Sequence, residues 1–344
     1  MQTYVQPTLT AEQGRAIWLS MRDEVQAQRL MTPQLIGTLG RLVLLYTLLG
    51  VALALSWFQT SWLVMGLAYL ALSVLLAQFA FMGHDAGHGA ISQKSSVNRL
   101  LGQLSMTLVT GLAFDEWIDR HRAHHRFCQV EAQDPDMAVA HVISLTSASL
   151  QQKTGFARFM SRYQHVYIWP LSFFFGHSQR HLSQWGVLSN LRRYPLDALV
   201  LVLHGALWFG LPCLVFNVPF GTALLSYVIP LFILGPHLAA IFWVNHIGMP
   251  LIEKADDFSF FEHQYVTSRS ISSSPLWNWF FGGLNFQIEH HLFPQVPSHR
   301  LGAVQRIVRK QFEARRITYS EVTWPQAIRS IAVHLRAVTE PAAS

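Results

Sequence analysis

Residues 42–57 read LVLLYTLLGVALALSW, an uninterrupted stretch without a charged side chain. With its flanks it runs from about residue 38 to 57. A helix of that length, at about 1.5 Å per residue, crosses a hydrocarbon core of about 30 Å. Three more stretches share this length and apolarity, at about residues 61–83, 196–216 and 222–244. The sequence therefore predicts an all-α integral membrane protein with four transmembrane helices.

The composition agrees with a membrane environment. Hydrophobic residues make up 51% of the 344 positions, and Asp, Glu, Lys and Arg together only 13%. That charged share is about half of what a soluble globular chain carries. The net charge of +6 could suggest a nucleic-acid partner, but the basic residues belong to no nucleic-acid-binding motif, and we expect none.

The basic residues predict how the spans cross the bilayer. The short turns at 58–61 and 217–222 contain no Lys or Arg. All 25 lie elsewhere: four up to residue 41, eleven in 84–195 and ten after residue 244. By the positive-inside rule, both termini and the central block are cytoplasmic. We expect two helical hairpins that carry a cytoplasmic helical cap, 84–195 and 245–344, in a single domain covering 1–344.

The first residues, MQTYVQPTLTAEQG, lack the basic and apolar regions of a cleavable signal. We therefore expect the first apolar stretch to direct insertion, into a bacterial inner membrane. Residues 97–113 have an amphipathic pattern, and Leu301–Arg316 predicts a basic helix suited to an anionic membrane surface. Cys128 and Cys213 are too few for a disulfide scaffold and are expected to be free.

Three histidine clusters predict a metal site. His84 and His88 lie at the cytoplasmic end of the second span. The second cluster lies in the central block and the third in the last block: His121, His124 and His125, then His290 and His291. On a helix, spacings of three and four residues place side chains on one face. Imidazole is a ligand for iron, copper, zinc and nickel, so each cluster offers two or three ligands from one helix.

The clusters and their flanks resemble the membrane fatty acid desaturases. The pattern is HxxxH, HxxHH and QxxHH, and residues 282–294 read GGLNFQIEHHLFP. This third cluster is similar to that of acyl-lipid and front-end desaturases, as is the Asp134-Pro135-Asp136 sequence after the second cluster. The resemblance covers about residues 35 to 315.

The resemblance implies two non-haem iron ions and O₂ as co-substrate. It implies the ligands His84, His88, His121, His124, His125, His290 and His291. The segment Asn245-His246-Ile247-Gly248-Met249-Pro250 adds His246 as an eighth. Gln287 stands where much of the broader family has a histidine. Its amide oxygen could coordinate weakly or hold a metal-bound water.

Three acidic residues near the clusters are candidate acceptors for the ligand rings. Metal-bound histidines commonly donate their second ring N–H to a carboxylate. Asp85, Asp119 and Glu289 could take that role, or could equally be solvated charges. The other histidines outside the spans lack cluster spacing and are expected to serve packing or the surface: His141, His165, His177, His181, His263, His299 and His334.

The implied reaction is the introduction of a double bond into a fatty acyl chain that is linked to a lipid, CoA or carrier protein. Such a reaction needs electrons. The sequence has neither a GxGxxG dinucleotide fingerprint nor an HPGG-like haem segment. We therefore expect a separate electron donor, such as a ferredoxin or a b-type cytochrome.

Three alternatives stay open. A di-iron membrane hydroxylase acting on a carotenoid or an alkane uses similar clusters, although the Gln-opened third cluster argues against it. A haem or metal transporter would place polar residues through its spans rather than at their ends. A membrane scaffold would leave the clusters unexplained. The sequence does not assign the double-bond position, acyl carrier or oligomeric state.

Two histidines lie inside the predicted spans. His204 is about nine residues into the third span, and His237 is about nine residues before His246 in the fourth. At about 1.5 Å per residue, both lie at a similar depth, roughly 14 Å from the cytoplasmic boundary. An ionisable residue at that depth needs a partner. We predict a hydrogen bond between the two rings that clamps the helices together.

Overall fold

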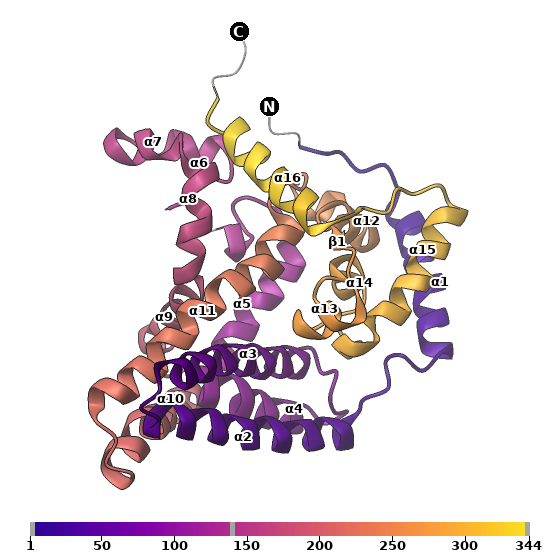
Figure 1. Ribbon diagram of the computed structural model, residues 1–344. Coiled ribbons are helices and arrows are strands. Elements are labelled where there is room, and N and C mark those ends of the chain that lie inside the picture. The colour runs from indigo at the N-terminus through magenta and orange to yellow at the C-terminus, as the bar shows by residue number, and fades with distance from the viewer. Residues whose placement is uncertain (1–3, 138–141, 341–344) are drawn as a thin grey trace. The chain divides into compact units, whose positions relative to one another are not determined.

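The computed structural model describes residues 4–137 and 142–340 (Figure 1). His141 lies outside these residues. The regular elements of the described residues are helices, apart from one short parallel strand pair in which β1 (Ser270–Ile271) lies beside β2 (Glu321–Val322). Within residues 4–137 and 142–340, four helices are long and apolar enough to cross a membrane. The predicted all-α membrane fold is confirmed.

The chain divides into two compact units. The span unit contains residues 32–119 and 172–239. The histidine unit contains the described residues of 1–31, 120–171 and 240–344. Two helices run from the span unit into the histidine unit: α5 (Phe114–Phe127) and α11 (Phe220–His246).

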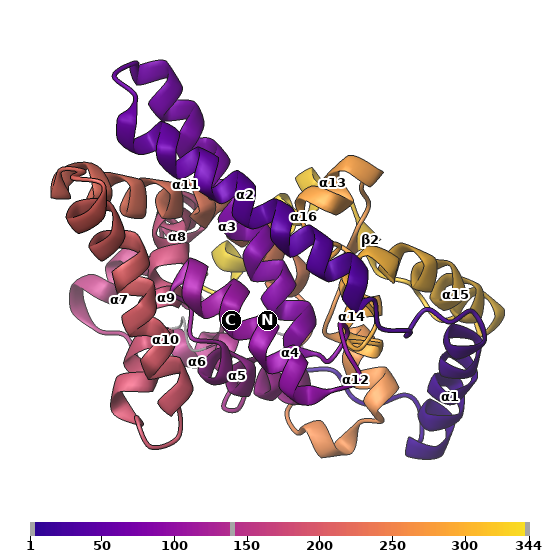
Figure 2. The same cartoon turned by 90° about the horizontal axis from the view of Figure 1, so that it is seen from below.

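The span unit holds the apolar helices. α2 (Leu35–Phe58) and α3 (Trp62–Gly87) form a hairpin, visible in Figures 1 and 2. α10 (Pro195–Gly205) continues into the π-helix η4 (Ala206–Val215), which α11 follows. These helices overlap the four predicted spans. The same unit contains η3 (Ser172–Phe174) and α9 (Phe175–Ser189).

Side chains cap the C-terminal end of one further helix of the span unit. α4 (Ser95–Gly102) continues into the π-helix η1 (Gln103–Thr110), within the stretch predicted to be amphipathic. The last carbonyls of a helix have no partner within it. Here four successive carbonyls, of residues 108–111, accept side-chain hydrogen bonds. The donors are His204 Nδ1 at 2.8 Å, Trp208 Nε1 at 3.0 Å, Arg180 Nε at 2.8 Å and Gln184 Nε2 at 3.1 Å.

The predicted hydrogen bond between His204 and His237 is wrong. His204 donates through Nδ1 to the Leu108 carbonyl, and its Nε2 lies 3.0 Å from the Tyr227 hydroxyl. Both ring nitrogens are therefore engaged. His237 instead meets the Phe81 ring edge-on, with centroids 6.1 Å apart. Equal depth does not fix rotation about the helix axis, and the buried end of η1 supplies a partner that the sequence did not reveal.

The histidine unit has two apolar cores. In the first, α1 (Ala11–Ala27) packs with α12 (Phe260–Val266), α14 (Gln287–Leu292) and α15 (Leu301–Ala314). α15 confirms the predicted basic helix, but its apolar face, including Val304 and Phe312, is buried in this core. Only its polar side is thus open to a membrane surface.

The second core joins Ile168, Val244, Ile271 and Ile331 with their neighbours. Ile331 comes from α16 (Trp324–Ala337), which packs against α8 (Gln164–Leu171). The remaining elements of this unit are α6 (Ser147–Gln151), α7 (Gly155–Ser161), η5 (Ala255–Asp257), α13 (Pro275–Phe280) and η6 (Ser298–Arg300).

Candidate metal centre

α5 carries the second histidine cluster. Its first turn is held in the span unit, where the Asp197 carboxylate accepts from the main-chain N–H groups of Asp115 (3.2 Å) and Glu116 (3.0 Å). A carboxylate at a helix N-terminus satisfies unpaired N–H groups and favours the helix dipole. From there the helix runs without Gly or Pro to Phe127. His121 and His125, one turn apart, bring their Nε2 atoms to 3.1 Å.

α14 carries the third cluster. All six of its residues are buried, which is unusual for a segment as polar as Gln-Ile-Glu-His-His-Leu. His290 Nε2 lies 3.1 Å from His125 Nε2. Two nitrogens bound to one metal at about 2.1 Å are about 3.0–3.4 Å apart at angles of 90–109°. The spacing of the His121, His125 and His290 nitrogens therefore suits ligands that share a metal ion.

A second group is formed by His124, His246 and His291. Their ring centroids are 4.9–5.2 Å apart. One ligand atom of each ring lies within 4.8 Å of the others and of the Cys128 sulfur. The rings come from three separate segments, namely α5, the last residue of α11, and α14. Tertiary packing of the histidine unit brings them together.

Each of these three rings is anchored through Nδ1. His124 Nδ1 lies 2.9 Å from Asp134 Oδ1, and His246 Nδ1 lies 3.1 Å from the Thr267 carbonyl oxygen. His291 Nδ1 lies 2.8 Å from Gln264 Oε1. An acceptor at Nδ1 places the ring proton there and leaves the Nε2 lone pair for a metal, as in many metal-bound histidines.

His291 provides the clearest test of fit. The ring is 0% exposed, and among the described residues its Nε2 has no hydrogen-bond partner. A buried polar atom without a partner costs about 1–3 kcal/mol. Nε2 belongs to the group that His124 and His246 complete, so a metal ion there would satisfy it. The residues therefore fit a metal centre.

The electrostatic surroundings of His124 and His291 differ. Burial lowers the pKa of His124, but the carboxylates of Asp134 and Asp136 outweigh this and raise it to about 9. These carboxylates stabilise positive charge at the ring, whether a proton or a metal ion supplies it. Burial and the neighbouring rings lower the pKa of His291 well below its ordinary value. His291 is therefore a neutral ring, as a metal ligand requires.

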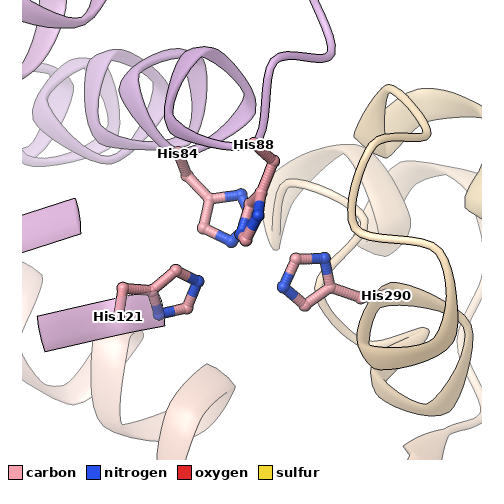
Figure 3. A group of neighbouring side chains, drawn as sticks. All are labelled: His84, His88, His121 and His290. Carbon is pink, nitrogen blue, oxygen red and sulfur yellow. The ribbon is translucent and has the colours of Figure 1, made fainter. Parts of the chain in front are cut away.

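The first cluster lies at the end of α3, in the span unit. His84 is buried and His88 half-buried, with ring centroids 4.7 Å apart (Figure 3). The helix continues through His84 to Gly87, and the chain then turns at Gly89, whose φ is +73°. Figure 3 also shows His121 and His290 of the histidine unit, whose rings are stacked with centroids 6.1 Å apart.

Gln287 lies beside one of the predicted ligands. Its Nε2 is 2.9 Å from His246 Nε2, and its Oε1 accepts from Asn245 Nδ2 at 3.0 Å. The amide thus lies next to the lone pair that His246 would offer to a metal. Its predicted role as a weak or water-mediated ligand stays a prediction.

The three predicted acidic acceptors lie in different surroundings. Asp85 Oδ1 is 3.7 Å from His84 Nδ1. Asp119 accepts from Arg193 at 2.8 Å and from the Tyr194 hydroxyl at 3.1 Å. Glu289 accepts from the Tyr319 hydroxyl at 2.7 Å and from Ser270 Oγ at 3.0 Å. Burial raises the pKa of Glu289 to about 7.

Sequence reasoning missed the groups that hold the ring protons. Asp134 had a signal, because the Asp-Pro-Asp sequence after the second cluster was already part of the resemblance. Gln264 and the Thr267 carbonyl had none, since both lie in a segment without cluster spacing. Cys128, expected only to be a free thiol, has its sulfur 3.4 Å from His246 Nδ1.

Comparison with known protein families shows which family the chain belongs to. The family model for fatty acid desaturases matches residues 60–323, which is most of the chain. The chain therefore belongs to the fatty acid desaturase family, and the resemblance inferred from the histidine clusters is confirmed.

Individual relatives include three plant enzymes. The chain is 31% identical to Delta(8)-fatty-acid desaturase 1 of Arabidopsis thaliana, over 76% of this chain and 61% of that protein. It is 29% identical to Delta(8)-fatty-acid desaturase 2 of the same plant, over 87% and 72%. It is 27% identical to the acyl-lipid (9-3)-desaturase of Borago officinalis, over 78% and 64%. The chain thus spans between 61% and 72% of these relatives' lengths.

Proposed function

We propose that the chain is an O₂-dependent fatty acid desaturase with two histidine-bound irons, acting as one domain over residues 1–344. The observation that supports this most directly is the anchored group of His124, His246 and His291 with its unpartnered buried Nε2. Family membership supports the same reaction class.

The proposed ligands form two sets. The Nε2 atoms of His124, His246 and His291 would hold one iron. His121, His125 and His290 would hold the other. His84 and His88, at the end of α3, stay predicted ligands because of the sequence resemblance. The 3.1 Å separations within the second set support shared coordination. An all-imidazole set suits iron, as well as copper, zinc and nickel.

Removing hydrogen from an unactivated methylene is beyond acid–base side chains, and bound irons would supply the oxidising power as O₂ is reduced to water. The balanced reaction takes two hydrogens from the acyl chain, plus two electrons and two protons from outside, and yields two waters. The protein's part is to hold the rings in place with their Nε2 atoms directed at the metal. The burial of His290 and His291, at 2% and 0% exposure, also keeps bulk water from the site.

We propose a fatty acyl substrate because the relatives named above are fatty-acid and acyl-lipid desaturases. A separate ferredoxin or b-type cytochrome would supply the two electrons that the reaction takes from outside. The distribution of Lys and Arg supports cytoplasmic termini and a cytoplasmic site. A bacterial inner membrane stays our expectation.

Product analysis and metal analysis together test the proposal. Cells that express the chain and a ferredoxin or cytochrome system should gain an unsaturated fatty acid, detected by gas chromatography with mass spectrometry. The purified protein should contain about two irons per chain. A hydroxylated carotenoid or alkane product would replace the desaturase assignment with the hydroxylase alternative. Zinc alone in an active preparation would contradict the di-iron proposal.

A further inference from the structure

We propose that Gln264, which lies outside the three clusters, is a positioning residue that fixes the proton of His291. This inference rests on the proposed function, because it treats His291 as an iron ligand. Gln264 lies in α12, 27 residues before His291, and is 1% exposed. Its Oε1 lies 2.8 Å from His291 Nδ1.

The contact decides which ring nitrogen can bind a metal. A neutral imidazole carries one proton, on either Nδ1 or Nε2. An amide oxygen at Nδ1 can only accept, so it selects the form protonated at Nδ1. The Nε2 lone pair then points into the group formed with His124 and His246. That atom has no hydrogen-bond partner among the described residues.

α12 holds Gln264 firmly, because its neighbours are themselves anchored. Glu262 accepts from the main-chain N–H groups of Thr8 at 2.8 Å and Leu9 at 3.1 Å. His263 donates through Nε2 to the Cys128 carbonyl at 2.8 Å. Three consecutive buried polar residues thus tie α12 to the N-terminal segment, to the end of α5 and to α14. The amide of Gln264 has a fixed position from which to orient the ring.

Gln264 also differs from the other two anchors. Asp134 places a negative charge on His124, and Thr267 offers a main-chain carbonyl to His246. Gln264 orients His291 through a neutral side chain and adds no charge. Because its acceptor belongs to a side chain, unlike the main-chain carbonyl of Thr267, a substitution can remove it.

Iron affinity, measured by competition with a chelator on purified protein, tests the assignment. Gln264→Met keeps the length of the side chain and removes the acceptor. It should lower iron affinity 10–100-fold, the usual effect of losing a hydrogen-bond partner of a metal-bound histidine. Gln264→Glu can still accept at Nδ1 and should keep affinity within a few-fold of the wild type.

Gln164→Met is the matched control. Gln164 is also buried in the histidine unit, at 0% exposure, but its amide bonds only main-chain groups of Ser144 and Leu335. This variant should lose thermal stability while its folded fraction binds iron normally. An equal loss of affinity in Gln164→Met and Gln264→Met would overturn the proposal, because it would reflect general destabilisation.

Two further outcomes are decisive. Wild-type affinity in Gln264→Met would refute the role of the amide. If Gln264→Met fails to accumulate, Gln264→Glu decides alone, since loss of iron in that variant contradicts an acceptor role. Absence of iron from an active wild type would instead refute the proposed function. The two ideas can thus fail separately.

Discussion

The proton of each histidine ring is the smallest feature on which the proposed chemistry depends. His124, His246 and His291 direct Nδ1 toward Asp134, the Thr267 carbonyl and Gln264. Of the three, His291 combines complete burial with an Nε2 that lacks a partner in the described residues. It is therefore the ring whose removal should be most informative.

We predict that His291→Ala loses at least one of about two irons per chain and more than 100-fold of desaturase activity. The reason is that His291 supplies one of only three imidazoles in its group, so its loss leaves His124 and His246 as the remaining rings. Elemental analysis of the purified protein and gas chromatography of cellular fatty acids measure the two effects. His181→Ala, at an exposed position of α9, is the control and should keep both. A His291→Ala protein with full iron content would show that the ring is not a ligand.

At this scale, the sequence predicted the histidines but not the groups that orient them. Helix geometry makes positions three and four residues apart neighbours, so His121, His124 and His125 could be placed on one face from spacing alone. The contact of Gln264 with His291 joins positions 27 residues apart through tertiary packing. Such a contact leaves no spacing pattern in a single sequence.

At the scale of the helices, His204 of the third span stabilises the protein through its hydrogen bond at the end of η1. His204→Phe would remove the side-chain donor of the Leu108 carbonyl and one hydrogen-bond partner of the Tyr227 hydroxyl. We predict a loss of about 1–3 kcal/mol from the Leu108 carbonyl left unsatisfied, with no change in the position of the double bond. Thermal unfolding in detergent and analysis of the product measure the two effects.

Double substitutions distinguish the His204–Tyr227 hydrogen bond from the His204–His237 hydrogen bond that equal depth predicted. His204→Phe and Tyr227→Phe share one hydrogen bond, so their combined effect should be smaller than the sum. His204→Phe and His237→Phe should be additive, because their rings have different partners. Strong coupling between His204 and His237 would instead favour the direct bond that depth alone predicted.

His334 of α16 makes the stability of the fold depend on pH, independently of the metal centre. His334 Nε2 donates to the Leu145 carbonyl at 2.9 Å. Burial lowers the pKa of His334, the bond to Leu145 opposes this in part, and Arg269 lowers the pKa further. The unfolded chain therefore binds more protons than the folded chain at pH values below about 6.5.

We predict that this histidine's contribution to stability is present above about pH 6.5 and lost as pH falls through its lowered pKa. The slope should be at most about 1.4 kcal/mol per pH unit. His334→Gln can still donate to Leu145 but does not titrate, so its stability should fall less on acidification. Thermal unfolding of both proteins between pH 5 and 8, at equal iron content, gives the comparison. Parallel curves would exclude His334 as the source.

The elements themselves were predicted in outline. Uninterrupted apolar runs revealed the four long helices, because length and hydropathy are properties of the sequence. α3 extends four residues past the predicted end, since nothing stops the helix before the turn at Gly89. The π-helices η1 and η4 were not predicted. Their altered hydrogen bonding depends on packing rather than on local pattern.

For the whole molecule, the distribution of basic residues makes orientation testable. We predict that a membrane-impermeant maleimide labels intact cells carrying Thr60→Cys or Pro219→Cys in a Cys213→Ser background. Gln93→Cys and Gln295→Cys should be labelled only after the membrane is permeabilised. All four positions are exposed, so accessibility reports sidedness rather than burial. The reverse pattern would invert the orientation given by the positive-inside rule.

The buried end of η1 has a consequence for biosynthesis. The side chains that donate to the carbonyls of residues 108–111 follow them in the chain by 70 to 99 residues. At about 5–20 residues per second, the ribosome reaches those donors about 4–20 s after it has made the helix. Until then the carbonyls need water or another temporary partner. The end of η1 can therefore reach its final hydrogen-bonded state only after the ribosome has synthesised α9 and the third span.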